Sequence, residues 1–183
     1  MKNQYFAIVF LGLAFLTACS SAKIISDIDQ QADFTQYQTY TWSAEEDPYN
    51  KNFPQFDNSL NRERWHKAID VAMKNQGYVL VEGAADIEVD FHLEFEHNVV
   101  PYHNNQVEVE DTYTSFRPTS GFHYDRGTVI IHFVDLSGEQ IIWQGISTKV
   151  IDMGQLEDAE ANIQKAANKI FEKLSKTLAK QLQ

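Results

Sequence analysis

The sequence contains a single cysteine, Cys19, so no disulfide can form within the chain. Basic residues are also few, with 15 Lys and Arg against 26 Asp and Glu and a net charge of -11. A surface of this sign repels phosphate backbones and anionic lipid headgroups, which argues against a nucleic-acid partner. Glycine-rich phosphate-binding loops are absent as well. We therefore expect no nucleic acid and no cofactor.

Long apolar stretches are lacking too. The run from Tyr5 to Leu16 is uninterrupted, but it is shorter than the ~20 residues that a transmembrane helix needs. Behind Lys2, this run has the length of the apolar part of a secretory signal peptide. The motif Leu16-Thr17-Ala18-Cys19 resembles the bacterial lipobox, in which a Leu and two small residues precede a Cys that becomes lipidated. An ordinary secretory signal with a chance Cys is the alternative interpretation.

These features predict a signal peptide over residues 1–18, a lipidated Cys19 with a short tether over 19–23, and one domain over 24–183. An acidic chain has no basic face to hold it on a bilayer, so the membrane is contacted through the lipid on Cys19. Ser20 follows the Cys, where Asp would retain a Gram-negative lipoprotein in the inner membrane. By resemblance to that rule, we expect a lipid-anchored protein of the outer membrane that faces the periplasm.

The first half of the domain is expected to contain short strands and one helix. β-branched and aromatic residues favour strands over Ile24–Ile28 and Tyr37–Trp42. A helix is expected between an N-cap at Asp57 or Asn58 and a C-terminal Gly77. Its apolar residues recur at helical spacing, and they are Leu60, Trp65, Ala68, Ile69, Ala72 and Met73.

The second half predicts a β-meander followed by a helix. Apolar and polar residues alternate from Ile87 to Glu96, which is typical of a strand with one buried face. Strands over Thr128–Val134 and Gln140–Thr148 flank a turn in which Gly138 is expected to take a positive φ. Residues 157–179 have the amphipathic stripe of a helix. The order of elements predicts an α+β domain, an antiparallel β-sheet with two helices packed on one face.

Several short motifs are shared with one known family. They are Asp27-Ile28-Asp29, Ala32-Asp33-Phe34, Tyr37, Tyr40, Trp42, Ala85-Asp86-Ile87, Gly127-Thr128, Val134-Asp135 and Trp143-Gln144-Gly145. Together they resemble the bacterial lipoprotein family known as domain of unknown function 4136, over about residues 24–178. The resemblance implies the same fold and an envelope location, and it supplies no catalytic residues. We expect Trp143 to be structural, with its ring in the core beneath the helices.

The side chains best suited to metal binding or catalysis are histidines set among acidic residues. They are His92, His97, His103, His123 and His132. Imidazoles and carboxylates are ligands of zinc. However, no pair forms a tight motif such as HExxH, and alternating acids suit a solvated strand face. We therefore predict no tight metal site, with His92 and His132 as the weak candidates.

Two functions of different classes remain. The preferred one is a noncatalytic binding or structural module of the envelope, which engages a protein partner through a sheet edge or through residues 99–126. The alternative is a metal-dependent or hydrolytic periplasmic enzyme, although the sequence has no nucleophile elbow and Cys19 is consumed by lipid. A concave pocket that collects the histidines and acids would favour the enzyme, and a flat distribution would favour the binding module.

Overall fold

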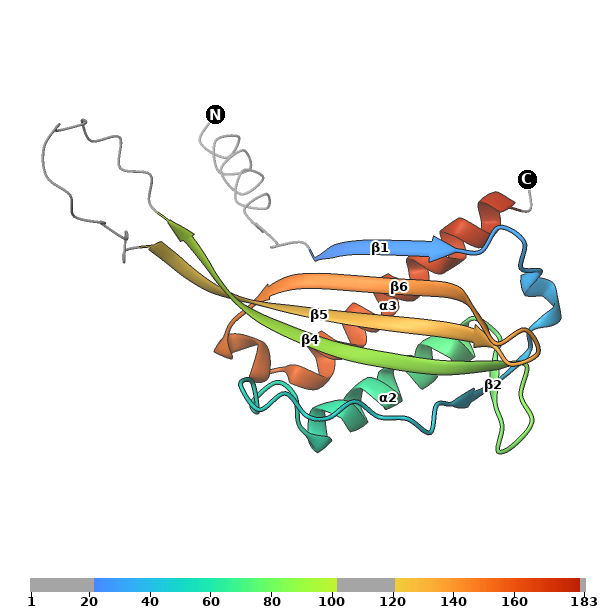
Figure 1. The fold of residues 1–183 in the computed structure, drawn as a ribbon, viewed down its shortest axis with the longest axis horizontal. Helices are drawn as coiled ribbons and strands as arrows, with labels where there is room; N and C mark the ends of the chain where they lie inside the picture. Colours follow the sequence, from blue (N-terminus) through green and yellow to red (C-terminus); the bar gives the residue numbers. More distant parts are fainter. Residues whose placement is uncertain (1–21, 102–120, 182–183) are drawn as a thin grey trace, which may run out of the picture.

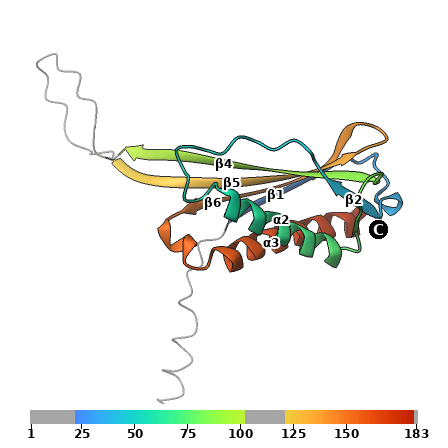
Figure 2. The ribbon, with the colours of Figure 1, turned by 90° about the horizontal axis from the view of Figure 1, so that it is seen from below.

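The computed structural model describes residues 22–101 and 121–181. Within these residues the chain forms a six-stranded sheet and two α-helices that pack on one of its faces (Figures 1 and 2). The predicted α+β fold with both helices on one face is therefore confirmed. The elements are β1 (Lys23–Ile28), η2 (Phe34–Gln36), β2 (Thr39–Trp42), α2 (Ser59–Asn75), β3 (Val79–Leu80), β4 (Ile87–Pro101), β5 (Gly121–Asp135), β6 (Gln140–Ile151), η3 (Met153–Leu156) and α3 (Ala159–Gln181).

The sheet is antiparallel except at one edge. Its strand order is β1-β6-β5-β4-β2-β3, with antiparallel pairing from β1 across to β4. Strand β2 instead pairs parallel to both β4 and β3. Helix α2 connects β2 to β3 and returns the chain to the end of the sheet at which β2 began. Strand β3 therefore runs in the same direction as β2, which makes their pairing parallel. The antiparallel sheet predicted from the sequence is thus a mixed one, because the alternation of residues does not encode strand direction.

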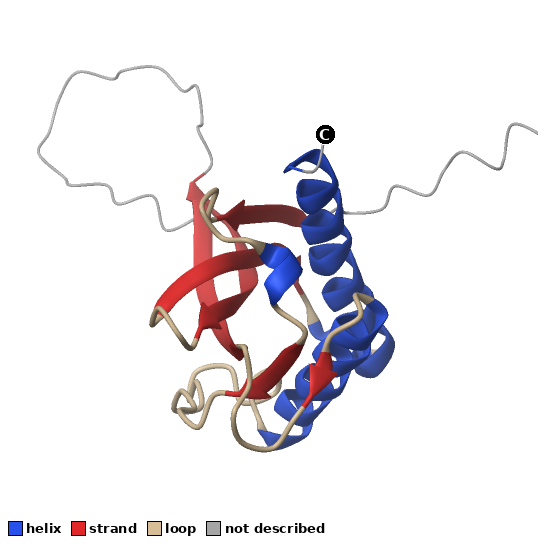
Figure 3. Ribbon diagram, turned by 90° about the vertical axis from the view of Figure 1, so that its right-hand side faces the viewer, coloured by secondary structure: helices blue, strands red, loops and turns tan. Residues whose placement is uncertain are grey.

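The alternation predicted for β4 sorts its side chains between the two faces of the sheet. Ile87 and Val89 are fully buried against the helices, as are Ile131 and Phe133 of the neighbouring β5. Intervening residues point to the opposite face. Figure 3 shows both helices along one side of the curved sheet, and no described helix covers the other side. We call these the inner and the outer face.

The predicted structural role of Trp143 is confirmed. The residue is 1% exposed, and the centroid of its ring lies 4.5 Å from that of Phe133. Its Nε1 donates a hydrogen bond to Ser26 Oγ at 2.9 Å. Buried indole N–H groups need such a partner. Gly145, two residues along β6, leaves room for this ring, because a Cβ there would overlap Trp143 and Ile170.

Helix α2 begins and ends close to where the sequence predicted. Asn58 Oδ1 accepts a hydrogen bond from the backbone N–H of Asn61 at 3.0 Å, so Asn58 rather than Asp57 is the N-cap. Gly77 follows the helix with a φ of +94°, the left-handed conformation that ends many helices. Leu60 was predicted to belong to the buried stripe, but it is 55% exposed, because the first turn of α2 points Asn61 and Arg62 inward instead, which are 5% and 9% exposed.

The β5–β6 turn differs from the prediction in its left-handed residue. Glu139 has a φ of +50°, whereas Gly138 does not take a positive φ. Asp135 fixes the turn, because its Oδ1 accepts hydrogen bonds from the backbone N–H of Ser137 at 2.8 Å and from its hydroxyl at 2.7 Å. Hydrogen bonds to the Asp135 side chain therefore shape this turn, in which a left-handed Gly138 was predicted.

Strands β4 and β5 extend well beyond the alternating segment 87–96 and the predicted strand 128–134. They stay paired antiparallel as far as Pro101 and Gly121, so the described ends of residues 99–126 form part of an extended hairpin. Strand β6 accompanies β5 only up to the pair Asp125–Ile151, so the remainder is a two-stranded ribbon. Residues 102–120 lie outside the described part, and so do any roles predicted for them.

Candidate functional site

The predicted anchor cannot be placed in this fold, because Cys19 and the signal peptide over 1–18 lie outside the described residues. Among the residues that are described, none of the helices combines the length and the apolar character needed to cross a bilayer. The first described residue, Ala22, lines a cavity.

This cavity has a volume of about 190 Å³ and lies between the sheet and the helices. Strands β4, β5 and β6 line it from the inner face, and α2, η3 and α3 line it from the other side. Its apolar lining includes Phe56, Trp65, Leu93, Phe95, Ile151 and Ile163.

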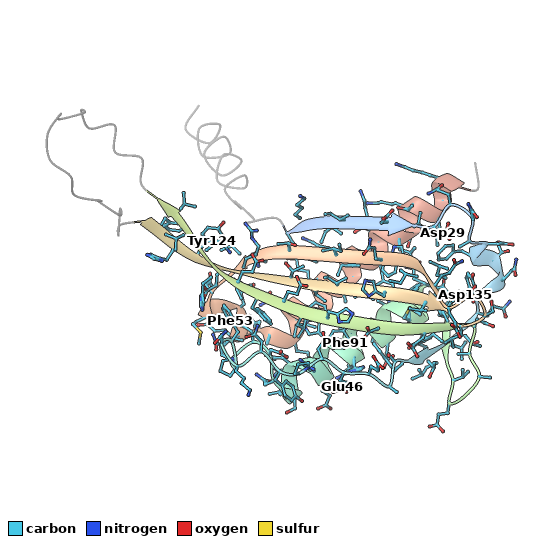
Figure 4. All side chains as sticks on the ribbon, in the orientation of Figure 1. Asp29, Glu46, Phe53, Phe91, Tyr124 and Asp135 are labelled. Carbon is cyan, nitrogen blue, oxygen red and sulfur yellow. The ribbon has the colours of Figure 1, made fainter. Side chains whose placement is uncertain are left out.

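Aromatic stacking fixes the loop before α2 against the far end of β4. Phe53 is 2% exposed and its ring centroid lies 5.4 Å from that of Phe95, while Phe56 stacks on the same ring at 5.9 Å. Figure 4 shows Phe53 at the end of the molecule where β4 and β5 leave the helices. Phe56 and Phe95 are thereby held as part of the cavity wall.

Lysines are the charged residues of the cavity lining. They are Lys149 of β6 and Lys165 and Lys169 of α3. Lys149 Nζ donates a hydrogen bond to Gln155 Oε1 at 2.7 Å. None of the three forms an ion pair within the described ranges, and the described lining contains no His, Asp or Glu. The cavity is therefore apolar and cationic in a chain that is strongly acidic.

The two weak metal candidates, His92 and His132, come together on the outer face. Asp90 and His92 lie two residues apart on β4, and His132 of β5 is the direct cross-strand partner of Asp90. One ligand atom from each of the three side chains lies within 4.8 Å of the other two, and all three residues are half-buried. We call this set the outer-face triad.

His92 contacts a carboxylate with each of its ring nitrogens. Nε2 lies 2.9 Å from Asp90 Oδ2, and Nδ1 lies 2.7 Å from Oδ2 of Asp47, in the loop before α2. Burial lowers the pKa of the neighbouring His132, and the charge of His92 lowers it further, against the opposite effects of Asp90 and of a hydrogen bond with Gln144. His132 is thus biased toward the neutral imidazole, the form that binds metals.

The other histidines lie elsewhere. His97 pairs with Asp125 at 2.6 Å on the ribbon, His123 is exposed, and His103 lies outside the described residues. His66, which the sequence did not single out, packs against Trp42 with ring centroids 4.2 Å apart. The sequence also missed Asp47 and the lysines of the cavity, because the relevant neighbours come from distant segments.

Comparison with known proteins gives a family. Residues 24–174 match the family described as "Domain of unknown function (DUF4136)". No curated protein matches the chain. A DUF4136 family protein from Bacteroides thetaiotaomicron has a TM-score of 0.52 at 13% identity, over 84% of this chain and 96% of that one.

Two further solved structures are similar to this chain to different degrees. A PDZ domain protein from Parabacteroides distasonis has a TM-score of 0.52 at 12% identity, over 80% of this chain, which spans only 35% of that protein. A minor lipoprotein from Acinetobacter baumannii has a TM-score of 0.41 at 7% identity, over 78% and 93% of the two chains. The two structures with a TM-score of 0.52, at 12% and 13% identity, are similar to this chain in fold alone. The match over residues 24–174 covers most of the sequence, as the shared motifs predicted, and the chain belongs to the DUF4136 family.

Proposed function

We propose that this chain is a noncatalytic binding protein of the bacterial cell envelope, attached through lipid on Cys19 to the outer membrane and facing the periplasm. Its ligand in this proposal is a fatty acid, with part of the acyl chain in the cavity and the carboxylate beside the lysines. The observation that carries the proposal is the combination of an apolar cavity with three lysines that form no ion pair among the described residues.

The apolar lining supports an acyl chain as the bound group. At about 190 Å³, the cavity exceeds the ~150 Å³ of a hydrocarbon-lined cavity that binds benzene. Each methylene transferred from water to such a lining contributes about 0.8 kcal/mol. A short stretch of acyl chain therefore supplies several kcal/mol of binding free energy, while the remainder of the chain lies outside.

The lysines support an anionic headgroup. A net charge of -11 repels anions in general, so a cluster of cations at the edge of a cavity is a local exception. Lys165 and Lys169 lie one turn apart on α3, which puts them on the same side of the helix. Their ammonium groups attract a carboxylate without demanding a fixed geometry.

The described cavity lining lacks the residues that hydrolysis requires, which favours binding over hydrolysis. A hydrolase needs a nucleophile next to a base, and the described lining offers the hydroxyl of Ser147 with no His, Asp or Glu beside it. The histidines that pair with carboxylates, His92 and His97, instead lie on strand β4, away from the cavity. Such a spread of these residues outside the cavity favours a binding module.

Quenching of Trp65 by a fatty acid brominated along its chain tests the proposal. A Cys19→Ala chain made with a cleavable signal peptide carries no lipid of its own, and its core lies wholly downstream of the substitution. We expect saturable quenching that disappears in Trp65→Phe, since the other tryptophans do not line the cavity. Ala166→Phe should abolish binding by filling the space.

The charge requirement has a matched control on the same helix. Replacing both Lys165 and Lys169 with Gln should weaken binding about three- to tenfold, as expected for two partly exposed ion pairs. Replacing Lys173 and Lys180 with Gln changes the net charge equally outside the cavity lining. Equal weakening in both double variants, or no quenching at all, contradicts fatty-acid binding. Quenching only in the unlipidated chain indicates that the acyl chains on Cys19 occupy the cavity.

The anchor is tested separately by membrane fractionation and intact mass. The wild-type chain should carry acyl mass on Cys19 and should stay with outer membranes in high salt, and Cys19→Ala should be released. A Cys19→Ala chain that still sediments with membranes would show that another part of the protein holds it there.

A further inference from the structure

We propose that the outer-face triad of Asp90, His92 and His132 binds a divalent cation of the zinc class. The site lies on the opposite face of the sheet from the cavity, so this proposal is independent of the fatty acid.

The strand register brings the three ligands together. Asp90 and His92 share a face because they are two residues apart on β4, and pairing of Asp90 with His132 adds the third ligand from β5. Their ligand atoms lie within 4.8 Å of one another. A tetrahedral ion with bonds of about 2.0–2.1 Å holds its ligand atoms ~3.3 Å apart. Small rotations of half-buried side chains would therefore close the site.

The environment of His92 also favours a cation. A neutral imidazole has a single N–H, so it can satisfy only one of the two carboxylates that it contacts at 2.7 and 2.9 Å. With a metal ion between Nε2 and Asp90, Nδ1–H donates to Asp47 and both contacts become favourable. A carboxylate that orients a metal-bound histidine in this way recurs in zinc proteins.

The donor set indicates the class of ion. Imidazole nitrogens suit zinc and its transition-metal neighbours, whereas calcium and magnesium prefer oxygen ligands. The carboxylates of Asp90 and Asp47 offset the double charge of the ion. The three protein ligands leave a fourth position that faces solvent, where water or a group from a partner completes a tetrahedral site.

Calorimetric titration of Zn²⁺ into the lipidated full chain, purified in detergent and treated with a chelator, tests the proposal. We expect one ion per chain, with affinity reduced at least a hundredfold in His132→Gln. Asp47→Asn should weaken binding about 10- to 100-fold although Asp47 is not a ligand, because it orients His92. Absorption of bound Co²⁺ should show a tetrahedral site that changes in both variants.

His97→Gln is the matched control, since it also breaks a histidine–carboxylate pair on β4 and leaves the triad intact. Its affinity should equal that of the wild type. Equal losses in His97→Gln and His132→Gln, or retention of stoichiometric binding in His132→Gln, would place the ion elsewhere and overturn the proposal. Lack of stoichiometric binding would overturn it too. Unfolding midpoints measured in chelator separate loss of metal from loss of fold.

Discussion

The two faces of strands β4, β5 and β6 carry different chemistry. On the inner face, buried aliphatic and aromatic side chains contact the helices and give way to a cavity lined with lysines. On the outer face, carboxylates and imidazoles occupy half-buried positions. Val89 and Asp90 are neighbours in the sequence, yet they belong to different faces because side chains alternate along a strand. One sheet can therefore offer an apolar, cationic site and a polar, anionic site without any insertion.

Among the substitutions that test this contrast, Trp143→Ala should have the largest effect on the free energy of unfolding. Removing a ring that is 1% exposed should lower the free energy of unfolding by about 3–5 kcal/mol. Gln144→Ala, the next residue on the opposite face, should change it by no more than ~0.5 kcal/mol. Denaturant unfolding of both variants measures the difference. Similar losses would mean that the outer face is as important for stability as the inner one.

Gly145→Ala should have a smaller effect on the same strand. The added methyl group overlaps the Trp143 ring and Ile170, and such overpacking typically costs about 1–3 kcal/mol. The control on the outer face is Thr148→Ala, which removes a contact of 3.1 Å between the hydroxyls of Thr128 and Thr148 and should cost at most ~1 kcal/mol. A fully stable Gly145→Ala chain would show that α3 can move away from the sheet at little cost.

The pH dependence of stability should show the smallest effect and should involve both faces. Burial lowers the pKa of His66 beside the inner face and of His132 on the outer face, each below the ordinary value of 6.5. Below that value the unfolded chain binds protons that the folded chain resists, so stability is lost as the pH falls from 6.5 through the lowered folded values.

Thermal unfolding between pH 7 and pH 5, in chelator, measures this loss. His66→Gln and His132→Gln should each flatten the decline in unfolding midpoint. A midpoint that rises on acidification would contradict the assigned direction for both histidines.

Features encoded within a few residues were predictable from the sequence. The alternation of β4, the Asn58 cap and the buried Trp143 depend on local spacing and on the large apolar area of one ring. The parallel pairing of β2 was not predictable, because it depends on how α2 returns the chain to the sheet. The positive φ at Glu139 was missed because Asp135 supplies hydrogen bonds that fix the turn.

The sequence singled out His92 and His132, but it predicted neither the complete triad nor the cavity, for a related reason. The outer-face triad depends on the register that sets Asp90 opposite His132, and a slip by one residue would point His132 toward the helices. The cavity depends on how far α3 packs from β6, which brings Lys149 near Lys165 and Lys169. Composition shows only that the chain is acidic overall, and it does not reveal where lysines from different segments come together.

The pairing of β1 with β6 has a consequence for the timing of folding. Trp143 and Ser26 are 117 residues apart in the sequence, yet their side chains are hydrogen-bonded and their strands are adjacent in the sheet. During synthesis from the N-terminus, β1 therefore leaves the ribosome early and waits for its partner until nearly the whole domain has followed. Contacts of such long range slow folding, and the unpaired strand is open to association with other chains meanwhile.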